Sequence, residues 1–141
     1  MSFEEKGTWV SAAVVAVIYA VYLSIILGRA ENLPLTEVAY ASTMLWTIGI
    51  AIVSSIAGHI AIAIANPSEA DKSDVRDRDI DRFGSYIGGI VLAVGMLVPF
   101  GLAMGEQDHF WIANAMYAAF VFSSLVSQAV KIIAYRRGIE R

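Results

Sequence analysis

The chain has 141 residues and no cysteine. Disulfide bonds, thiolate catalysis, cysteine-ligated iron–sulfur clusters and zinc sites built on cysteine are therefore excluded. Charged residues make up only 16% of the chain and hydrophobic residues 57%, a departure from soluble composition toward that of membrane proteins. The most basic connection, residues 66–82, is at least as acidic as it is basic, so we expect no nucleic-acid partner.

Recognisable catalytic motifs are also absent from the sequence. No glycine-rich loop follows a predicted strand, no HExxH motif occurs, and no serine stands in a familiar pattern with a histidine and a carboxylate. No aspartate or glutamate lies deep within an apolar stretch, so the buried carboxylate of a small multidrug exporter has no counterpart. We therefore expect a non-enzymatic protein with no catalytic residues and no metal site.

Long apolar stretches dominate what is present. They cover residues 9–27, 38–65, 83–104 and 110–134. Each is close to or above the roughly 20 residues that cross a bilayer as a helix. The sequence thus predicts an all-α, four-transmembrane-helix bundle in contact with the lipid bilayer. Its expected divisions are a first hairpin (residues 1–65), a charged connection (66–82), and a second hairpin with a basic tail (83–141).

Positive charge is distributed unevenly around these stretches. Nine of the ten basic residues flank one side of the pattern: Lys6, Lys72, Arg76, Arg78, Arg82, Lys131, Arg136, Arg137 and Arg141. Only Arg29 lies in the other connections. Because cytoplasmic flanks of membrane helices are enriched in lysine and arginine, we expect a multi-pass protein of the inner or plasma membrane, with both termini cytoplasmic.

The two halves of the chain show weak similarity. Gly7-Thr8-Trp9-Val10 matches Gly84-Ser85-Tyr86-Ile87 in residue type, and Ser54-Ser55-Ile56 matches Ser123-Ser124-Leu125. This pattern indicates a duplicated hairpin, which would give parallel repeats related by an axis along the membrane normal. The alternative is chance similarity between apolar segments drawn from few residue types.

Small residues recur at four-residue intervals in every predicted span. In the third span they are Ser85, Gly89, Ala93, Gly101 and Gly105, a series broken only by Leu97. Small side chains allow helices to approach closely in lipid, so these stripes either pack the four helices together or leave one face for a homo-oligomer. Pro99 should kink the third span or loosen its hydrogen-bond ladder, since proline lacks the amide proton.

Three polar residues are candidates for intramembrane function: His59, Gln128 and Asn114. His59 is the only ionisable side chain well inside a predicted span, a costly placement that suggests a function. It is a candidate for haem binding, with two copies of His59 facing each other across a dimer axis. The alternative is a neutral histidine hydrogen-bonded to a serine hydroxyl or to Gln128, with no cofactor at all.

The connection before the third span carries alternating charges. We expect Ser73 to cap a helix that begins in the cytoplasm and continues into the membrane. The candidate interaction residues on it are Asp74, Arg76, Asp77, Arg78, Asp79 and Arg82. They form either a solvated collar or a docking surface for a cytoplasmic protein or lipid headgroups.

Four segments carry a family resemblance. They are Glu4-Glu5-Lys6 with Trp9, the run from Asp74 to Asp79 leading into Gly84, Asp108-His109-Phe110-Trp111-Ile112-Ala113-Asn114, and Tyr135-Arg136-Arg137-Gly138. In these the chain resembles small four-span bacterial and archaeal integral membrane proteins whose charged loop often reads Asp-Glu-Arg-Asp; Val75 departs from that pattern. The resemblance implies a four-span topology and brings no activity with it.

Three functions fit these features. The first is a non-enzymatic interaction or regulatory subunit that forms homo-oligomers and contacts a cytoplasmic partner. The second is an oligomeric transporter or channel, since four short helices alone leave little room for an aqueous path. The third is a haem-binding membrane protein that uses His59.

Overall fold

The computed structural model describes residues 2–65, 67 and 74–138. The elements, in chain order, are α1 (Phe3–Arg29), η1 (Leu35–Glu37), α2 (Ala41–Ala65), α3 (Val75–Gly95), α4 (Leu97–Met104) and α5 (His109–Arg137). Four stretches, one of them α3 and α4 together, are long and apolar enough to span a membrane. The predicted all-α architecture with four long helices is confirmed.

Local signals explain where the helices begin. Ser2 caps α1, because its hydroxyl accepts a hydrogen bond from the backbone N–H of Glu5 at 3.2 Å. Asp108 caps α5 by accepting from the N–H of Phe110 at 2.8 Å. Pro34 precedes η1, and α2 begins only at Ala41, three residues after the predicted start of that span.

Pro99 has the effect predicted for it. The third span is interrupted at Met96, which separates α3 from α4. Proline at position 99 lacks the N–H that would bond to the carbonyl of Gly95, one turn earlier. The helix resumes at once, because Met96 still accepts from the N–H of Phe100 at 3.1 Å.

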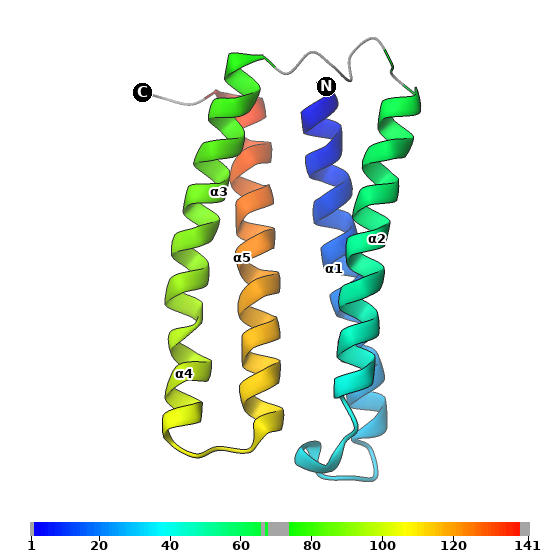
Figure 1. Ribbon diagram of the computed structural model, residues 1–141, viewed down its shortest axis with the longest axis vertical. Helices are drawn as coiled ribbons and strands as arrows, with labels where there is room; N and C mark the ends of the chain where they lie inside the picture. The colour runs from blue at the N-terminus through cyan, green and yellow to red at the C-terminus, as the bar shows by residue number, and fades with distance from the viewer. Residues whose placement is uncertain (1, 66, 68–73, 139–141) are drawn as a thin grey trace.

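The helices stand side by side in the order α3–α4, α5, α1, α2 (Figure 1). Each hairpin packs on itself, α1 with α2 and α3–α4 with α5, and the two hairpins meet along α1 and α5. Both ends of the chain lie at the same end of the bundle (Figure 1). Helices α1 and α5 are therefore central, while α2 and α3 form the edges.

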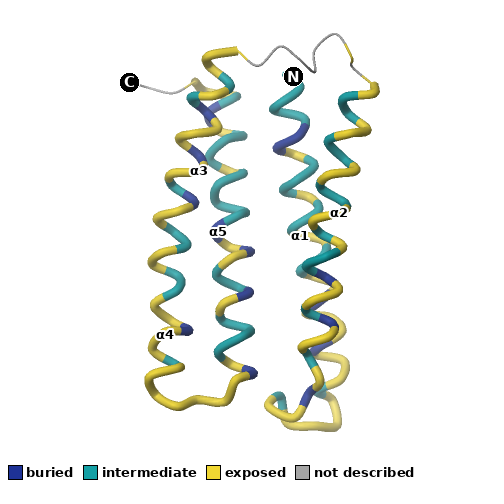
Figure 2. The backbone as a smooth tube through the Cα atoms, in the orientation of Figure 1, coloured by how far each residue is buried: buried dark blue, intermediate teal, exposed yellow. Residues whose placement is uncertain are grey.

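Burial is sparse along these helices. Buried positions lie on the inward faces, and most of the helical surface is exposed (Figure 2). The core cluster consists of Tyr22, Ile26, Val38, Phe110, Tyr117 and Val121. Most of these residues belong to the end of the bundle remote from the chain termini. No residue in the apolar 18-residue window of α2 is buried, as expected for an edge helix in lipid.

Candidate functional site

The charged segment at the start of α3 forms a capping box. The Asp74 carboxylate accepts from the N–H of Val75 at 2.6 Å, and the Asp77 carboxylate accepts from the N–H of Asp74 at 3.4 Å. The predicted cap at Ser73 is wrong, because α3 begins at Val75 with Asp74 as its N-cap; Ser73 itself lies outside the described residues.

Two polar contacts tie this segment to α5. Arg76 donates from Nη2 to the carbonyl of Tyr135 at 3.2 Å, and the Lys131 ammonium lies 2.6 Å from the Asp81 carboxylate. The Lys131 side chain is only 12% exposed, whereas Asp81 is 70% exposed. A Cβ atom at Gly84 would collide with the Lys131 stem, so glycine at position 84 allows this lysine to cross α3.

A polar pocket of about 460 Å³ lies at this end, between the first turn of α1 and the first two turns of α3. It is lined by Glu4, Asp77, Arg78, Asp81 and Arg82. The structure thus brings together three of the six predicted interaction residues. Of the others, Asp74 caps α3, Arg76 contacts α5 and Asp79 is half-buried.

His59 is half-buried on the face of α2 that packs against α1. Its Nδ1 donates to the backbone carbonyl of Ser55 at 2.8 Å, rather than to the predicted serine hydroxyl or to Gln128. Its Nε2 faces Gly7 of α1, where a Cβ atom would lie only 2.8 Å away. Because α1 of the same chain covers this nitrogen, the geometry gives no support to iron ligation across a dimer.

Asn114 belongs to a partly buried polar cluster that the sequence did not predict. Its side-chain oxygen accepts from the Tyr22 hydroxyl at 2.6 Å, and its amide donates to the carbonyl of Phe110 at 2.9 Å. Nearby, the Tyr117 and Thr47 hydroxyls are 3.2 Å apart. These contacts join α1, α2 and α5.

A ring cluster surrounds those hydrogen bonds. Tyr19 and Tyr22 both pack edge-on against Tyr117, with centroids 5.2 Å and 5.0 Å apart. The signal for this cluster was present in the sequence, since Tyr19 and Tyr22 are three residues apart, as are Asn114 and Tyr117. Such spacing puts each pair on one helix face.

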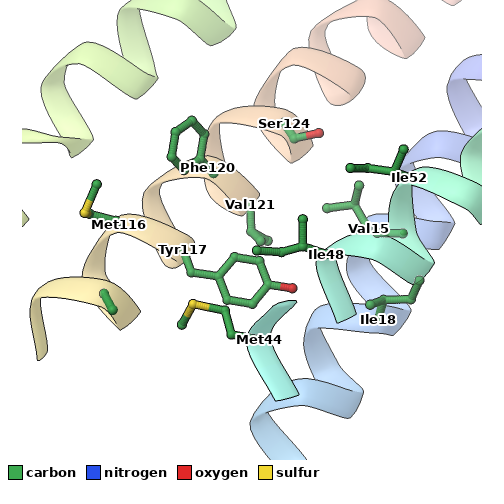
Figure 3. A pocket seen from close by; sticks show the side chains of 12 residues that line it. Val15, Ile18, Met44, Ile48, Ile52, Met116, Tyr117, Phe120, Val121 and Ser124 are labelled. Atoms are coloured by element: carbon green, nitrogen blue, oxygen red, sulfur yellow. The ribbon is translucent and has the colours of Figure 1, made fainter. Parts of the chain in front are cut away.

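An apolar groove of about 560 Å³ runs between α1, α2 and α5 (Figure 3). Its walls include Val15 from α1, Ile48 and Ile52 from α2, and Met116 and Phe120 from α5. Ile52 and Phe120 are more than half exposed, so the groove opens to the surroundings of the bundle.

Comparisons with protein-family models, curated proteins and solved structures give no match. The class of the protein follows from the helices themselves, whose length and composition indicate a multi-pass membrane protein. No family is identified, so the resemblance to other small four-span proteins stays a prediction.

Proposed function

We propose that this chain is a small, non-enzymatic membrane subunit that assembles with copies of itself. The observation that carries the proposal is the position of the small-residue stripe in the third span. Its members Ser85, Gly89, Ala93, Gly101 and Gly105 are all exposed. A Cβ atom at Gly89 or Gly101 would meet nothing within 4 Å. Leu97 interrupts this stripe, and Ala93 borders a pocket shared with Ile112 and Met116 of α5. The glycines of the stripe are turned away from the rest of the chain, where a second copy can approach closely.

The stripes of α2 and α5 contrast with this one, whereas the α1 stripe is also exposed at Ala16, Ala20, Ser24 and Gly28. On α2, Thr43 and Thr47 are buried, and on α5 Ser123 is buried with its hydroxyl bonded to the carbonyl of Gly88 at 2.7 Å. Those stripes pack the chain onto itself. The exposed glycines of α3 and α4 serve no such packing within one copy.

The interior polar groups favour a structural over a catalytic role. Within the described residues, every buried side-chain nitrogen and oxygen has a hydrogen-bond partner. The Asn114 side-chain oxygen and the Tyr117 hydroxyl bond to neighbouring helices, whereas the Asn114 amide and His59 Nδ1 bond within their own helices. Groups bound in this way hold helices in register.

We also propose that the end of the bundle with the chain termini is cytoplasmic. The described basic residues at that end are Lys6, Arg76, Arg78, Arg82, Lys131, Arg136 and Arg137, against Arg29 alone at the other. The polar pocket between α1 and α3 lies at this end, as a docking surface for a cytoplasmic protein would require.

A tandem origin of the two hairpins is part of the proposal. Gly7 and Gly84, which are equivalent in the sequence repeat, both lie where a long side chain from the second helix of the same hairpin crosses: His59 over Gly7, and Lys131 over Gly84. The crossing residues are not themselves equivalent, because His59 aligns with Gln128 in the repeat, so the support for duplication comes from the matched glycines. The packing order does not follow the repeat, because the two central helices are α1, the first helix of its hairpin, and α5, the last helix of the other hairpin. The two hairpins therefore contact each other through helices that are not equivalent.

Oxidative cross-linking tests self-assembly, because the chain has no native cysteine. Ala93→Cys, on the exposed stripe, should form a disulfide-linked dimer when membranes are treated with an oxidant. Ala57→Cys, exposed on the outer face of α2, is the matched control and should stay monomeric. Adding Gly89→Leu to Ala93→Cys should abolish the dimer by blocking close approach. Equal cross-linking at the two cysteines would overturn the proposal.

A further inference from the structure

The polar pocket near the chain termini has charges of both signs in its walls. Glu4 of α1 lines one side, and Asp77, Arg78, Asp81 and Arg82 of α3 line the other. We infer that this pocket binds the headgroup of a bilayer phospholipid that carries both a phosphate and a primary ammonium, as ethanolamine phospholipids do. Lipid recognition of this kind goes beyond self-assembly.

The pocket lies at the depth of lipid headgroups. The apolar stretches begin at Trp9 on α1 and at Phe83 on α3, and the charged lining comes shortly before them. At 1.5 Å per residue, the lining residues lie about 2–9 Å beyond those positions. A bilayer leaves roughly 5–8 Å for the headgroups of each leaflet, outside a hydrocarbon core of about 30 Å. A headgroup thus reaches the pocket directly, whereas a cytoplasmic protein must first enter the headgroup layer.

An aromatic contact marks the same level. The Arg136 guanidinium of α5 lies over the Trp9 ring, 5.5 Å from its centroid. Tryptophan favours the membrane interface, because its ring is apolar and its N–H is polar. The start of α3 and the start of α1 lie at this end of the bundle together (Figure 1). The pocket between them therefore opens among headgroups.

Two arginines of the lining provide the phosphate subsite. Arg78 and Arg82 are four residues apart, so they share one face of α3. Among the residues that the structure describes, neither guanidinium has an ion-pair or side-chain hydrogen-bond partner. Guanidinium groups bind phosphate oxygens through pairs of N–H donors, so one phosphate can bridge the two side chains.

The carboxylates of the lining provide the cation subsite. Asp81 is already paired with Lys131 at 2.6 Å, so its charge is neutralised. Asp77 uses one oxygen, at 3.4 Å, in the capping box, and Glu4 forms no ion pair with another described residue. Two carboxylates and two guanidinium groups thus remain, and they do not pair with each other. A ligand with one charge of each sign complements this arrangement.

The lining also distinguishes one headgroup from another. A primary ammonium has three N–H donors for Glu4 and Asp77, whereas the trimethylammonium of choline has none. An anionic glycerol headgroup offers a phosphate to the arginines but brings no cation to the carboxylates. The pocket therefore favours ethanolamine over both choline and glycerol.

Native mass spectrometry of the full-length protein in detergent tests the inference. Phosphatidylethanolamine, phosphatidylcholine and phosphatidylglycerol with identical acyl chains are titrated, and the first lipid bound to a single chain is quantified. The ethanolamine lipid should bind about tenfold more tightly than the choline lipid, which corresponds to about 1.4 kcal/mol. Because binding is read on the mass of one chain, the result does not depend on self-assembly. Equal affinities for the three lipids would overturn the inference and leave the pocket to a cytoplasmic protein.

Two adjacent glutamates in the first turn of α1 form a matched pair. Glu4→Gln removes a carboxylate that lines the pocket, whereas Glu5→Gln removes one that does not. Glu4→Gln should lower the preference for ethanolamine over choline from about tenfold to about threefold, since half of its free energy stays with Asp77. Glu5→Gln should leave the preference unchanged. Equal effects of the two changes would contradict the assignment of the pocket. If Glu4→Gln does not fold, the preference measured in the unaltered protein still decides.

A second matched pair examines the phosphate subsite. Arg82 lines the pocket, whereas Arg137, at the same end of the bundle, does not. Arg82→Gln should weaken binding of all three phospholipids by a similar factor, because each has a phosphate, and should keep the preference for ethanolamine. Arg137→Gln should change neither quantity. An Arg82→Gln variant that binds every lipid as the unaltered protein does would refute the phosphate subsite.

A soluble molecule with the same headgroup separates the two sources of this chemistry. Glycerophosphoethanolamine has the phosphate and the primary ammonium but no acyl chains. It should not displace phosphatidylethanolamine when the two are present at equal concentration, because the acyl chains hold the lipid at the depth of the pocket. Displacement at equal concentration would assign the pocket to a soluble ligand and overturn the choice of a lipid.

Discussion

Two adjacent glycines of α3 face opposite ways, and this difference gives a sharp prediction. A Cβ atom at Gly88 would lie 2.8 Å from the Cβ of Ser127 and 3.3 Å from the carbonyl oxygen of Ser123 on α5. A Cβ atom at Gly89 would meet nothing within 4 Å. Replacement of each glycine by alanine therefore adds the same methyl group to a packed interface in one case and to an open face in the other.

The expected magnitudes follow from two opposing effects. Alanine is favoured over glycine inside a helix by about 1 kcal/mol, so in the dissociated chain, where no second copy covers this face, Gly89→Ala should raise the free energy of unfolding by up to that amount. At Gly88 the same gain is offset by overpacking, which costs about 1–3 kcal/mol. Separation of the helices also strains the 2.7 Å bond from Ser123 to the Gly88 carbonyl, at about 1 kcal/mol. Gly88→Ala should therefore lower the free energy of unfolding by about 1–3 kcal/mol.

The assay is reversible unfolding in mixed micelles as the denaturing detergent is increased, followed by circular dichroism. The two variants should shift the midpoint in opposite directions. In a Gly88→Ala background, Ser127→Gly removes the colliding Cβ atom, so the double variant should recover part of the loss despite the lower helix propensity of glycine. Shifts of the same sign for Gly88→Ala and Gly89→Ala, or a Ser127→Gly change that only adds to the loss, would refute the proposed packing of α3 on α5.

Three further predictions concern polar contacts and use the same unfolding assay. Asn114→Ala should lower stability by about 1–2 kcal/mol, because the Tyr22 hydroxyl, on a fully buried residue, loses its acceptor; an unchanged midpoint would contradict this. Asp81→Asn should lower the free energy of unfolding by about 1–2 kcal/mol, because it removes the counter-charge of the largely buried Lys131. Adding Lys131→Met to Asp81→Asn should restore part of that loss; no recovery would count against the pairing of Asp81 with Lys131. Asp74→Ala should lower the free energy of unfolding by about 1 kcal/mol, because α3 loses its N-cap. Asp74→Ser should keep most of that stability, because serine also caps helices; equal losses in the two variants would exclude a capping role.

Hydropathy predicted the four helices because a bilayer requires long apolar segments whose backbone groups bond internally. It did not predict their first turns. Helix α1 starts at Phe3, six residues before the apolar stretch, and α3 starts at Val75, eight residues before it. These turns are charged, so they carry no hydropathy signal, and only the capping residues Ser2 and Asp74 mark them.

The inward faces of the helices were less predictable than their positions. Helix α3 contains two adjacent rows of small residues, one with Gly84 and Gly88 and the other with Ser85 and Gly89. Spacing alone does not distinguish the rows, because it fixes the angle between residues but not the rotation of the helix about its axis. That rotation is set by α5, on which Ser127 and Lys131 fit only against glycine. Packing against α5, rather than residue spacing, therefore determines which of the two rows is exposed.

A few polar contacts decide the arrangement of this bundle. Lipid supplies no hydrophobic drive to bring helices together, so close packing and hydrogen bonds must select the neighbours. Within the second hairpin, the carbonyl of Gly88 and the carboxylate of Asp81 both bond to α5. Between the hairpins, Tyr22 bonds to Asn114. Loss of Asn114 should therefore loosen the α1–α5 contact first, while each hairpin stays intact through contacts of its own.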